Sequence, residues 1–334
     1  MRGLRATEIR ELVPMRHAIE LMKTVFAASS RGEVSSPLRT PIDMPDGSGV
    51  VLFMPAFVPL SDVSPSSVGA KIVSVFGGNR DLGLPTINAI VVVVDPTTGV
   101  PLGILEGASV TALRTGAVSG AATDLLARDN ARTLAVIGAG AQGVTQAAAV
   151  GAVRDLDVIW VVDRSEASLD SFGERLGIWA PELVDRVRIT TDARKAVEAA
   201  DVICTATTST TPVFEDAWLR PGTHINAVGA YTPAMQEIPD ATIARSYLVV
   251  DEVEAALHEA GDLIQAIERG AIQRGDVVTE LGQIVNGSAR FRADANEITF
   301  FKSVGNAIQD MIVAGAALQA AEARGIGQQL NLSS

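Results

Sequence analysis

One stretch decides the fold of this 334-residue chain: Leu134-Ala135-Val136-Ile137-Gly138-Ala139-Gly140-Ala141-Gln142-Gly143. Four apolar residues predict a short strand, and the glycines that follow have the spacing GxGxxG. In a chain with 30 glycines this spacing alone is weak evidence. Its context is stronger, because a helix is expected over 141–153 and a second strand ends at Asp163. Strand, glycine turn, helix and acidic strand end together predict a dinucleotide-binding unit.

The three glycines have different expected roles. Gly138 and Gly140 allow a tight turn and a close approach of the backbone to a pyrophosphate, and Gly143 lets the helix pack on the strand. Asp163 stands where a carboxylate accepts hydrogen bonds from the adenosine ribose. A carboxylate there repels a 2′-phosphate, so NAD(H) is expected in preference to NADP(H). Use of NADP(H) stays open, because Arg164 follows directly and can turn toward a phosphate.

Beyond this stretch, apolar strands and helices alternate, which predicts a parallel sheet covered on both faces. The expected strands are 133–138, 157–163, 187–190, 201–206, 224–228 and 247–250, and the expected helices are 141–153, 165–176 and 193–200. We expect the end of the chain, 298–324, to be one long Ala-rich helix that can return to the first part of the chain.

The first third of the chain has a different pattern. Residues 15–31 carry apolar side chains at helical spacing. Three strands without intervening helices, 50–57, 68–76 and 89–94, predict a mainly antiparallel sheet. A long helix is expected over 109–128, capped by Ser109.

The composition excludes several classes of protein. A formal net charge of −12 argues against nucleic-acid binding, which needs a surplus of Lys and Arg. No apolar run reaches the roughly 18–20 residues of a membrane-spanning helix. Residues 1–16 hold four Arg but no apolar block, so a secretory signal is not expected. The single cysteine, Cys204, fits a reducing cytoplasm, and three scattered histidines predict no metal site.

Five further motifs occur together in this chain: Gly69-Ala70-Lys71-Ile72-Val73, Gly83-Leu84-Pro85-Thr86, Thr111-Ala112-Leu113-Arg114-Thr115-Gly116-Ala117, His224-Ile225-Asn226-Ala227-Val228-Gly229 and Ile298-Thr299-Phe300-Phe301-Lys302-Ser303-Val304-Gly305. With the glycine turn they resemble the ornithine cyclodeaminase/μ-crystallin family, in the family's order and over nearly the whole chain. The resemblance does not select a substrate, since this family includes cyclodeaminases, alanine dehydrogenases, ketimine reductases and hormone-binding crystallins.

The resemblance implies an α/β fold of two domains: a Rossmann parallel-sheet domain, 116–305, and an α+β substrate-binding and dimerisation domain, 1–115 with 306–334. It implies a homodimer and a small imino or amino acid as substrate. Arg39 matches the arginine that binds the substrate carboxylate, Lys71 a substrate-contacting lysine, and Arg114 an arginine between carboxylate and cofactor. Val304 matches a position near the substrate. The positions expected to bind the cofactor are Thr86, Arg114, Gly138, Gly140, Ala141, Gln142, Gly143, Asp163, Arg164, Thr207, Asn226, Val228 and Ser303.

The chemistry of Lys71 supports this assignment independently. The chain has only four lysines, and this one stands in the apolar stretch 68–76. If its side chain points inward, it must be paired or have a lowered pKa. A pocket that combines Arg39, Lys71 and Arg114 would hold a carboxylate firmly.

One position departs from the family pattern. Cyclodeaminases and alanine dehydrogenases carry an acid/base aspartate two residues after the last glycine of Asn-Ala-Val-Gly, and Tyr231 stands there in this chain. A phenol, with an ordinary pKa of about 10, is a poor base at neutral pH. We therefore expect reduction of a preformed cyclic imine, Δ1-pyrroline-2-carboxylate or Δ1-piperideine-2-carboxylate, with Lys71, Arg114 and Tyr231 as catalytic residues. An ornithine cyclodeaminase, an alanine or other amino-acid dehydrogenase, and a non-catalytic dinucleotide-gated binder remain alternatives.

Overall fold

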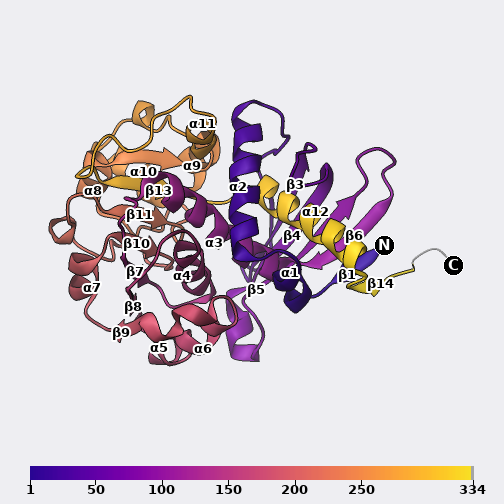
Figure 1. Cartoon of the computed structure of the whole chain (residues 1–334), viewed down its shortest axis with the longest axis horizontal. Helices are drawn as coiled ribbons and strands as arrows, with labels where there is room; N and C mark the ends of the chain where they lie inside the picture. Colours follow the sequence, from indigo (N-terminus) through magenta and orange to yellow (C-terminus); the bar gives the residue numbers. More distant parts are fainter. Residues whose placement is uncertain (332–334) are drawn as a thin grey trace. The chain divides into compact units, whose positions relative to one another are not determined.

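The computed structural model describes residues 1–331, apart from the side chain of Arg80. Contacts divide the chain into two units (Figure 1): unit 1 comprises Met1–Arg114 and Asn306–Ser334, and unit 2 comprises Thr115–Gly305. The domain bounds expected from the sequence, 1–115 with 306–334 and 116–305, stay a prediction. The polypeptide passes from unit 1 into unit 2 within helix α3 (Gly107–Leu126).

Unit 1 is built on a sheet of seven strands within the described residues, in the order β14-β1-β6-β5-β4-β3-β2. The strands are β1 (Arg2–Leu4), β2 (Thr40–Asp43), β3 (Val50–Val58), β4 (Ser67–Val75), β5 (Ile87–Val94), β6 (Pro101–Glu106) and β14 (Gln328–Gln329). Neighbours from β2 to β6 are antiparallel, and β1 pairs with β6 in parallel. The prediction of a mainly antiparallel sheet is confirmed, although β1, β2, β6 and β14 were not expected.

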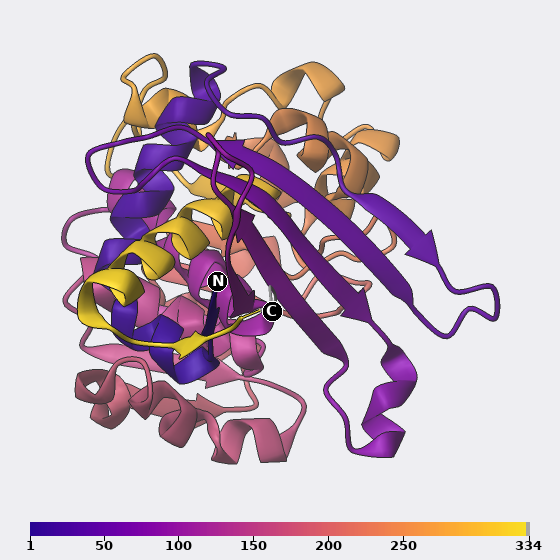
Figure 2. The ribbon, with the colours of Figure 1, turned by 90° about the vertical axis from the view of Figure 1, so that its right-hand side faces the viewer.

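Three helices pack in unit 1 besides the first part of α3: α1 (Ala6–Leu12), α2 (Met15–Ser30) and α12 (Ala307–Arg324). A short 3-10 helix, η1 (Gly77–Leu82), joins β4 to β5. The apolar stripe predicted for α2 is buried in the structure. Helix α12, yellow in Figure 2, packs against β3, β4 and α2, so it covers one face of the sheet.

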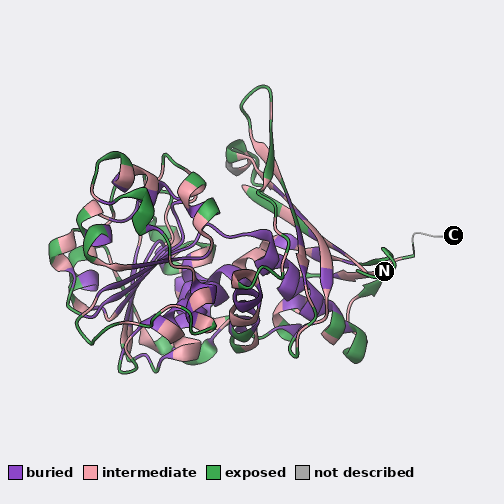
Figure 3. Cartoon of the chain, turned by 90° about the horizontal axis from the view of Figure 1, so that it is seen from above, coloured by how far each residue is buried: buried purple, intermediate pink, exposed green. Residues whose placement is uncertain are grey.

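The two faces of this sheet differ. Met54, Lys71 and Val91 stand opposite one another on neighbouring strands, and all three are buried. Phe53, 37% exposed, and Ile90, 43% exposed, lie on the other face. This second face is apolar and solvent-exposed. Figure 3 shows exposed residues, in green, and half-buried residues, in pink, along the strands of this sheet.

Unit 2 contains a second sheet of seven described strands, in the order β12-β13-β11-β10-β7-β8-β9. Each pair of neighbouring strands in this sheet is parallel, which confirms the expected Rossmann sheet. The strands are β7 (Thr133–Ile137), β8 (Val158–Val162), β9 (Val187–Thr190), β10 (Val202–Thr205), β11 (His224–Ala227), β12 (Tyr247–Val250) and β13 (Thr299–Lys302). Its central strands are buried, purple in Figure 3, as near-continuous apolar runs in a sheet covered on both faces must be.

The helices of unit 2 are α4 (Ala141–Val153), α5 (Glu166–Asp170), α6 (Phe172–Gly177), α7 (Ala193–Ala199), α8 (Asp240–Arg245), α9 (Val253–Glu259), α10 (Gly261–Glu268) and α11 (Leu281–Val285), with 3-10 turns η2 (Pro181–Arg186), η3 (Asp216–Trp218) and η4 (Arg274–Asp276). Across residues 1–331, none of the helices combines the length and apolar character that crossing a bilayer requires.

The expectation of one helix over 298–324 was wrong. The first residues of that range form β13, which is inserted between β11 and β12, and the helix begins only at Ala307. Thr299, Phe300 and Phe301 are β-branched or aromatic residues, which favour a strand once neighbouring strands are available on both sides.

Two helix boundaries also differ from the expected ones. Helix α3 begins at Gly107, and its first turn is capped by Glu106, whose carboxylate accepts the backbone N–H groups of Ala108 and Ser109. Ser109 therefore lies inside the helix. The expected helix 165–176 is divided at Ser171 into α5 and α6.

Candidate active site

The glycine turn joins β7 to α4 and leaves open space above its backbone. Gly138 has φ +105°, and a Cβ atom there would lie 2.5 Å from the carbonyl oxygen of Ala206. At Gly143 a Cβ would lie 2.0 Å from the carbonyl oxygen of Gly138. At Gly140, by contrast, none of the described atoms lies within 4 Å of a Cβ. The turn is therefore tightly packed at Gly138 and Gly143 and open at Gly140.

The N-terminus of α4 can receive a phosphate. Gly140 is the N-cap residue, and among the described residues no side chain caps the helix. Ala141 is exposed, while Gln142 is half-buried and its carbonyl oxygen accepts the hydroxyl of Thr145 at 3.0 Å. Backbone N–H groups at an uncapped helix N-terminus are natural donors to a pyrophosphate. The residues of this turn therefore fit a dinucleotide.

Asp163 follows β8 and is fixed beside this turn. Its Oδ2 accepts the backbone N–H of Ala139 at 2.6 Å, and its Oδ1 accepts that of Ser165 at 2.8 Å. The Nη2 of Arg175 donates to the carbonyl oxygen of Ala139 at 2.6 Å. Burial lowers the pKa of Arg175 and the Asp163 carboxylate raises it, so the two charges interact. Arg164 is exposed. The sequence analysis did not identify Arg175, which comes from α6.

The second group of candidate residues lies in unit 1 and centres on Asp310 of α12. The Nζ of Lys71, from β4, lies 2.6 Å from Asp310 Oδ2, and the Nε of Arg114, from α3, lies 3.2 Å from Asp310 Oδ1. The Nη1 of Arg114 also donates to Gln309 Oε1 at 2.8 Å. Asp310 is fully buried, and Lys71 is 2% exposed.

Sequence reasoning missed Asp310, although a signal was present. It is the only acidic residue between positions 298 and 321, and it is followed by the mostly apolar run 311–318. A lone buried carboxylate needs a cation nearby, and Lys71 and Arg114 supply that charge.

Burial lowers the pKa of Lys71 to about 8; Asp310 opposes this shift, whereas the positive charges of Arg114 and Arg39 add to it. Arg39, half-buried between α2 and β2, thus acts on Lys71. Three cations and one carboxylate leave a net charge of +2 when Lys71 is protonated. Such a group is suited to bind a carboxylate and to lose a proton near neutral pH.

Within residues 1–331, no three His, Cys, Asp or Glu side chains are grouped so that they could hold a metal ion.

The family model described as "Ornithine cyclodeaminase/mu-crystallin family" matches residues 3–324. This chain belongs to that family. The expected relationship is therefore confirmed.

Among the curated members of the family, a Delta(1)-pyrroline-2-carboxylate reductase of Bacillus cereus is 38% identical over 326 residues, covering 97% of this chain and 98% of the relative. Two solved structures are also similar. The Thermococcus litoralis Delta(1)-pyrroline-2-carboxylate reductase, in complex with NADH and L-proline, has a TM-score of 0.91 and 36% identity, covering 99% of this chain and all of that chain. An archaeal alanine dehydrogenase dimer with bound NAD has a TM-score of 0.88 and 31% identity, covering 100% of this chain and 99% of that one.

The remaining positions expected from the family lie mostly at the carboxyl ends of the unit 2 strands. Thr207 follows β10 and is half-buried, and Val228 follows β11 and donates its N–H to Thr205. Ser303 and Val304 follow β13; the Ser303 hydroxyl and the Val304 N–H both donate to Asp251 Oδ2, at 2.7 and 3.1 Å. Ligands of open parallel sheets bind outside these strand ends.

Three expected residues lie in other surroundings. Asn226 is buried within β11, and its amide donates to Thr123 Oγ1 at 2.9 Å. Thr86 belongs to unit 1, where its carbonyl oxygen accepts the N–H of Phe76. Tyr231 is half-buried in the loop after β11 and packs against the apolar core of unit 2. The proposed contacts of these residues with cofactor or substrate stay predictions.

Proposed function

We propose that this chain reduces a cyclic imino acid, Δ1-pyrroline-2-carboxylate or its six-membered analogue Δ1-piperideine-2-carboxylate, to the cyclic amino acid. The observation that carries the proposal is the buried Lys71–Asp310–Arg114 group. It combines positive charge for a substrate carboxylate with a lysine that can release a proton near neutral pH. Similarity over the full length to the reductase of Bacillus cereus supports it.

Each residue of this group has a proposed task. Arg39 and Arg114 bind the substrate carboxylate through charge-assisted hydrogen bonds. Lys71 protonates the imine nitrogen, which makes the neighbouring carbon electrophilic, and becomes a neutral amine. A bound NADH supplies the hydride that this carbon accepts. Asp310 is not a substrate ligand in this proposal: it holds Lys71 and Arg114 in place and keeps Lys71 protonated at neutral pH.

Tyr231 favours imine reduction over ring closure from a free amine. A cyclodeaminase needs a base for the substrate amine and a charge for the nitrogen that leaves as ammonia. A preformed ring needs neither, and a phenol can still order water or donate a hydrogen bond. Amino-acid dehydrogenase activity is the second candidate, because the archaeal alanine dehydrogenase shares the fold over the whole chain.

For the cofactor, we propose NADH in preference to NADPH. Asp163 lies beside the glycine turn with both oxygens oriented by backbone N–H groups. A fixed carboxylate there accepts ribose hydroxyl groups and repels a 2′-phosphate. The positive charges of Arg175 and the exposed Arg164 reduce the preference for NADH over NADPH but do not remove it.

We also propose that the chain forms a homodimer through the second face of the unit 1 sheet, the solvent-exposed one that carries Phe53 and Ile90. This surface is called the uncovered face below. Phe53, Ile72 and Ile90 are in register across three strands on this face. Ile42 and Leu102 extend the apolar area onto β2 and β6, at 50% and 40% exposure. Contiguous apolar surface of this kind marks protein interfaces. The dimeric state of the archaeal alanine dehydrogenase is in keeping with this proposal.

The experiment is an NADH-oxidation assay with Δ1-pyrroline-2-carboxylate and Δ1-piperideine-2-carboxylate. Pyruvate with ammonia tests the dehydrogenase alternative, and L-ornithine with NAD⁺ tests the cyclodeaminase. We expect reduction of a cyclic imine and little or no ammonia from ornithine. The Lys71→Ala variant should lose on the order of a hundredfold or more in kcat/KM, whereas Lys195→Ala, in α7, should not. Robust formation of proline and ammonia from ornithine would overturn the proposal.

A further inference from the structure

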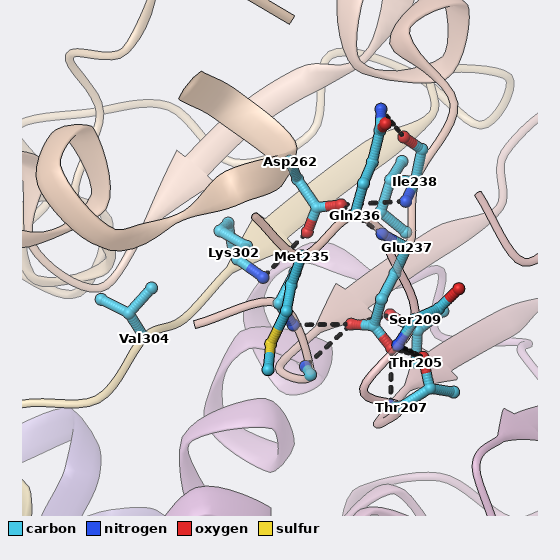
Figure 4. A network of polar contacts seen from close by, with 12 residues as sticks. Thr205, Thr207, Ser209, Met235, Gln236, Glu237, Ile238, Asp262, Lys302 and Val304 are labelled. Carbon is cyan, nitrogen blue, oxygen red and sulfur yellow. Dashed lines mark hydrogen bonds and ion pairs between the residues drawn. The ribbon is translucent and has the colours of Figure 1, made fainter. Parts of the chain in front are cut away.

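Glu237 is a fully buried carboxylate in unit 2 that the proposed reaction does not use. It lies between β11 and α8, and its side chain reaches the carboxyl ends of β10 and β11 (Figure 4). Its Oε1 accepts the backbone N–H of Thr207 at 2.7 Å and the Thr207 hydroxyl at 2.8 Å. Its Oε2 accepts the N–H groups of Gly229 and Ala230, at 2.8 and 3.1 Å, and the hydroxyl of Thr205 at 3.0 Å. One carboxylate therefore joins two loops.

A second carboxylate, that of Asp262, accepts hydrogen bonds from the backbone at Glu237. Asp262, at the start of α10, is also fully buried. Its Oδ1 accepts the backbone N–H groups of Glu237 and Ile238, at 2.7 and 3.0 Å. Its Oδ2 accepts the ammonium group of Lys302, the last residue of β13, at 2.9 Å. The contacts thus link the ends of β10, β11 and β13 in one network.

This network is expensive to bury. Two carboxylates and one ammonium, all fully buried, carry a net charge of −1 when each is ionised. Burial raises the pKa of Glu237 and the neighbouring Asp262 raises it further, while the ammonium of Lys302 lowers it. Three of the donors to Glu237 are backbone N–H groups, which can only donate, so the anionic carboxylate is the form that satisfies them. Apolar side chains would usually fill such a position at lower cost.

The segments that Glu237 holds are those that carry the expected site residues. Thr207 and Val228 are expected cofactor contacts, and Tyr231 follows Ala230 directly. The fit is close: a Cβ at Gly229 would lie 2.4 Å from Glu237 Oε1 and 2.3 Å from the carbonyl oxygen of Thr207. Neither loop can shift here without breaking hydrogen bonds to the carboxylate.

We propose that Glu237 is a positioning residue for dinucleotide binding: it holds the Thr207 loop and the Gly229–Ala230 turn in their binding conformation before the cofactor arrives. Asp262 and Lys302 keep Glu237 in place. The inference rests on the proposed function only in that a nicotinamide dinucleotide is the ligand; it does not depend on which imino or amino acid is the substrate.

Glu237→Gln is the decisive variant, because the change in shape is minimal. Whichever way the new amide is turned, its –NH₂ group faces backbone N–H groups, which are also donors. These are the N–H of Thr207 in one orientation and the N–H groups of Gly229 and Ala230 in the other. We expect the Kd for NADH, measured by calorimetric titration without substrate, to rise about 10- to 100-fold. The KM for NADH should rise in parallel, and the KM for the imino acid should stay within about twofold.

The matched control is Asp201→Asn at the opposite end of the same sheet. Asp201 directly precedes β10 and accepts the backbone N–H groups of Arg132 and Thr133, at 2.9 and 3.1 Å. Its loss should lower the melting temperature but leave the Kd for NADH unchanged. A milder variant, Thr205→Val, removes one of the five donors to Glu237 and should weaken NADH binding a few-fold while the protein stays folded.

These measurements distinguish a positioning role of Glu237 from a purely structural one. An unchanged Kd in Glu237→Gln overturns the proposal. A Kd that rises in both Glu237→Gln and Asp201→Asn, in proportion to the loss of melting temperature, assigns Glu237 a structural role and overturns it as well. If Glu237→Gln does not fold, Thr205→Val decides, and unchanged NADH binding there counts against the proposal. Failure of the proposed function would appear differently, as a wild-type chain that binds NADH but reduces no cyclic imine.

Discussion

At the scale of single residues, the surroundings of Lys71 in unit 1 determine its protonation. Among the residues that the structure describes, its ammonium group contacts one carboxylate, that of Asp310, and lies 3.5 Å from the hydroxyl of Thr111. The other charged groups that act on it, Arg114 and Arg39, are both cations. The protonation of Lys71 therefore depends on one anion working against burial and two positive charges.

A pH prediction follows for Asp310. Lys71 is protonated below its pKa of about 8, so a rate that needs its proton is high below that pH and falls as the pH rises through about 8. Asp310→Asn removes the negative charge that raises this pKa. We expect the alkaline limb of the kcat/KM profile for the cyclic imine to move to lower pH. Glu322→Gln, on the exposed face of the same helix, is the control, and a profile that stays in place in Asp310→Asn would exclude this role.

A second prediction at the scale of single residues concerns Asp163 and the choice between NADH and NADPH. We expect the wild-type chain to use NADH with a kcat/KM on the order of tenfold or more above that for NADPH, because the fixed carboxylate repels a 2′-phosphate. Asp163→Ser should narrow or reverse this ratio. Asp170→Asn, an exposed carboxylate on the neighbouring α5, should leave it unchanged. Equal use of both cofactors by the wild type would mean that Arg164 and Arg175 dominate.

At the scale of elements, the uncovered face of the unit 1 sheet makes a prediction about assembly. A charge placed among its in-register apolar residues should prevent two copies from burying that face, since an unpaired buried charge is costly. We expect Ile90→Asp to convert a dimer into a monomer, measured by light scattering coupled to gel filtration. Ile189→Asp is the control, because Ile189 is similarly exposed, at 48%, on the edge strand β9 of unit 2. A monomeric wild type, or a dimeric Ile90→Asp, would contradict the proposed interface.

At the scale of the whole molecule, stability should fall in acid because of His224. This histidine is fully buried in β11, where its Nδ1 lies 2.8 Å from Thr299 Oγ1 and its Nε2 lies 3.2 Å from Asn226 Oδ1. Burial lowers its pKa from 6.5 to about 3. The unfolded chain therefore takes up a proton near pH 6.5, and the folded chain does not until about pH 3.

The sign of the effect follows from this difference. The contribution of His224 is fully present above pH 6.5 and is lost progressively as the pH falls from 6.5 toward 3, by on the order of a few kcal/mol. Urea unfolding at pH 7.5 and at pH 5 measures it. His224→Gln should flatten the dependence of the unfolding free energy on pH, whereas His258→Gln, at an exposed position on α9, should not. An equally steep dependence in His224→Gln would show that other groups cause it.

Much of the fold could be predicted because its signals are local. The GxGxxG turn, the strands around it and Asp163 lie within about 30 consecutive residues, and each element has its own periodicity. The antiparallel strands of unit 1 also followed from short apolar runs without intervening helices. Family motifs brought in Arg39, Lys71 and Arg114 by position, and the structure places Lys71 and Arg114 on one carboxylate.

What only the tertiary structure decided involves partners far apart in the chain. Asp310 meets Lys71 across 239 positions, and the carboxylate of Glu237 is shared by loops that follow two different strands. Thr299–Lys302 fits either a helix or a strand by itself and becomes β13 because β11 and β12 supply hydrogen bonds on both sides. Local sequence sets which conformations a segment can adopt, whereas the pairing of buried charges and backbone groups between distant segments selects one of them.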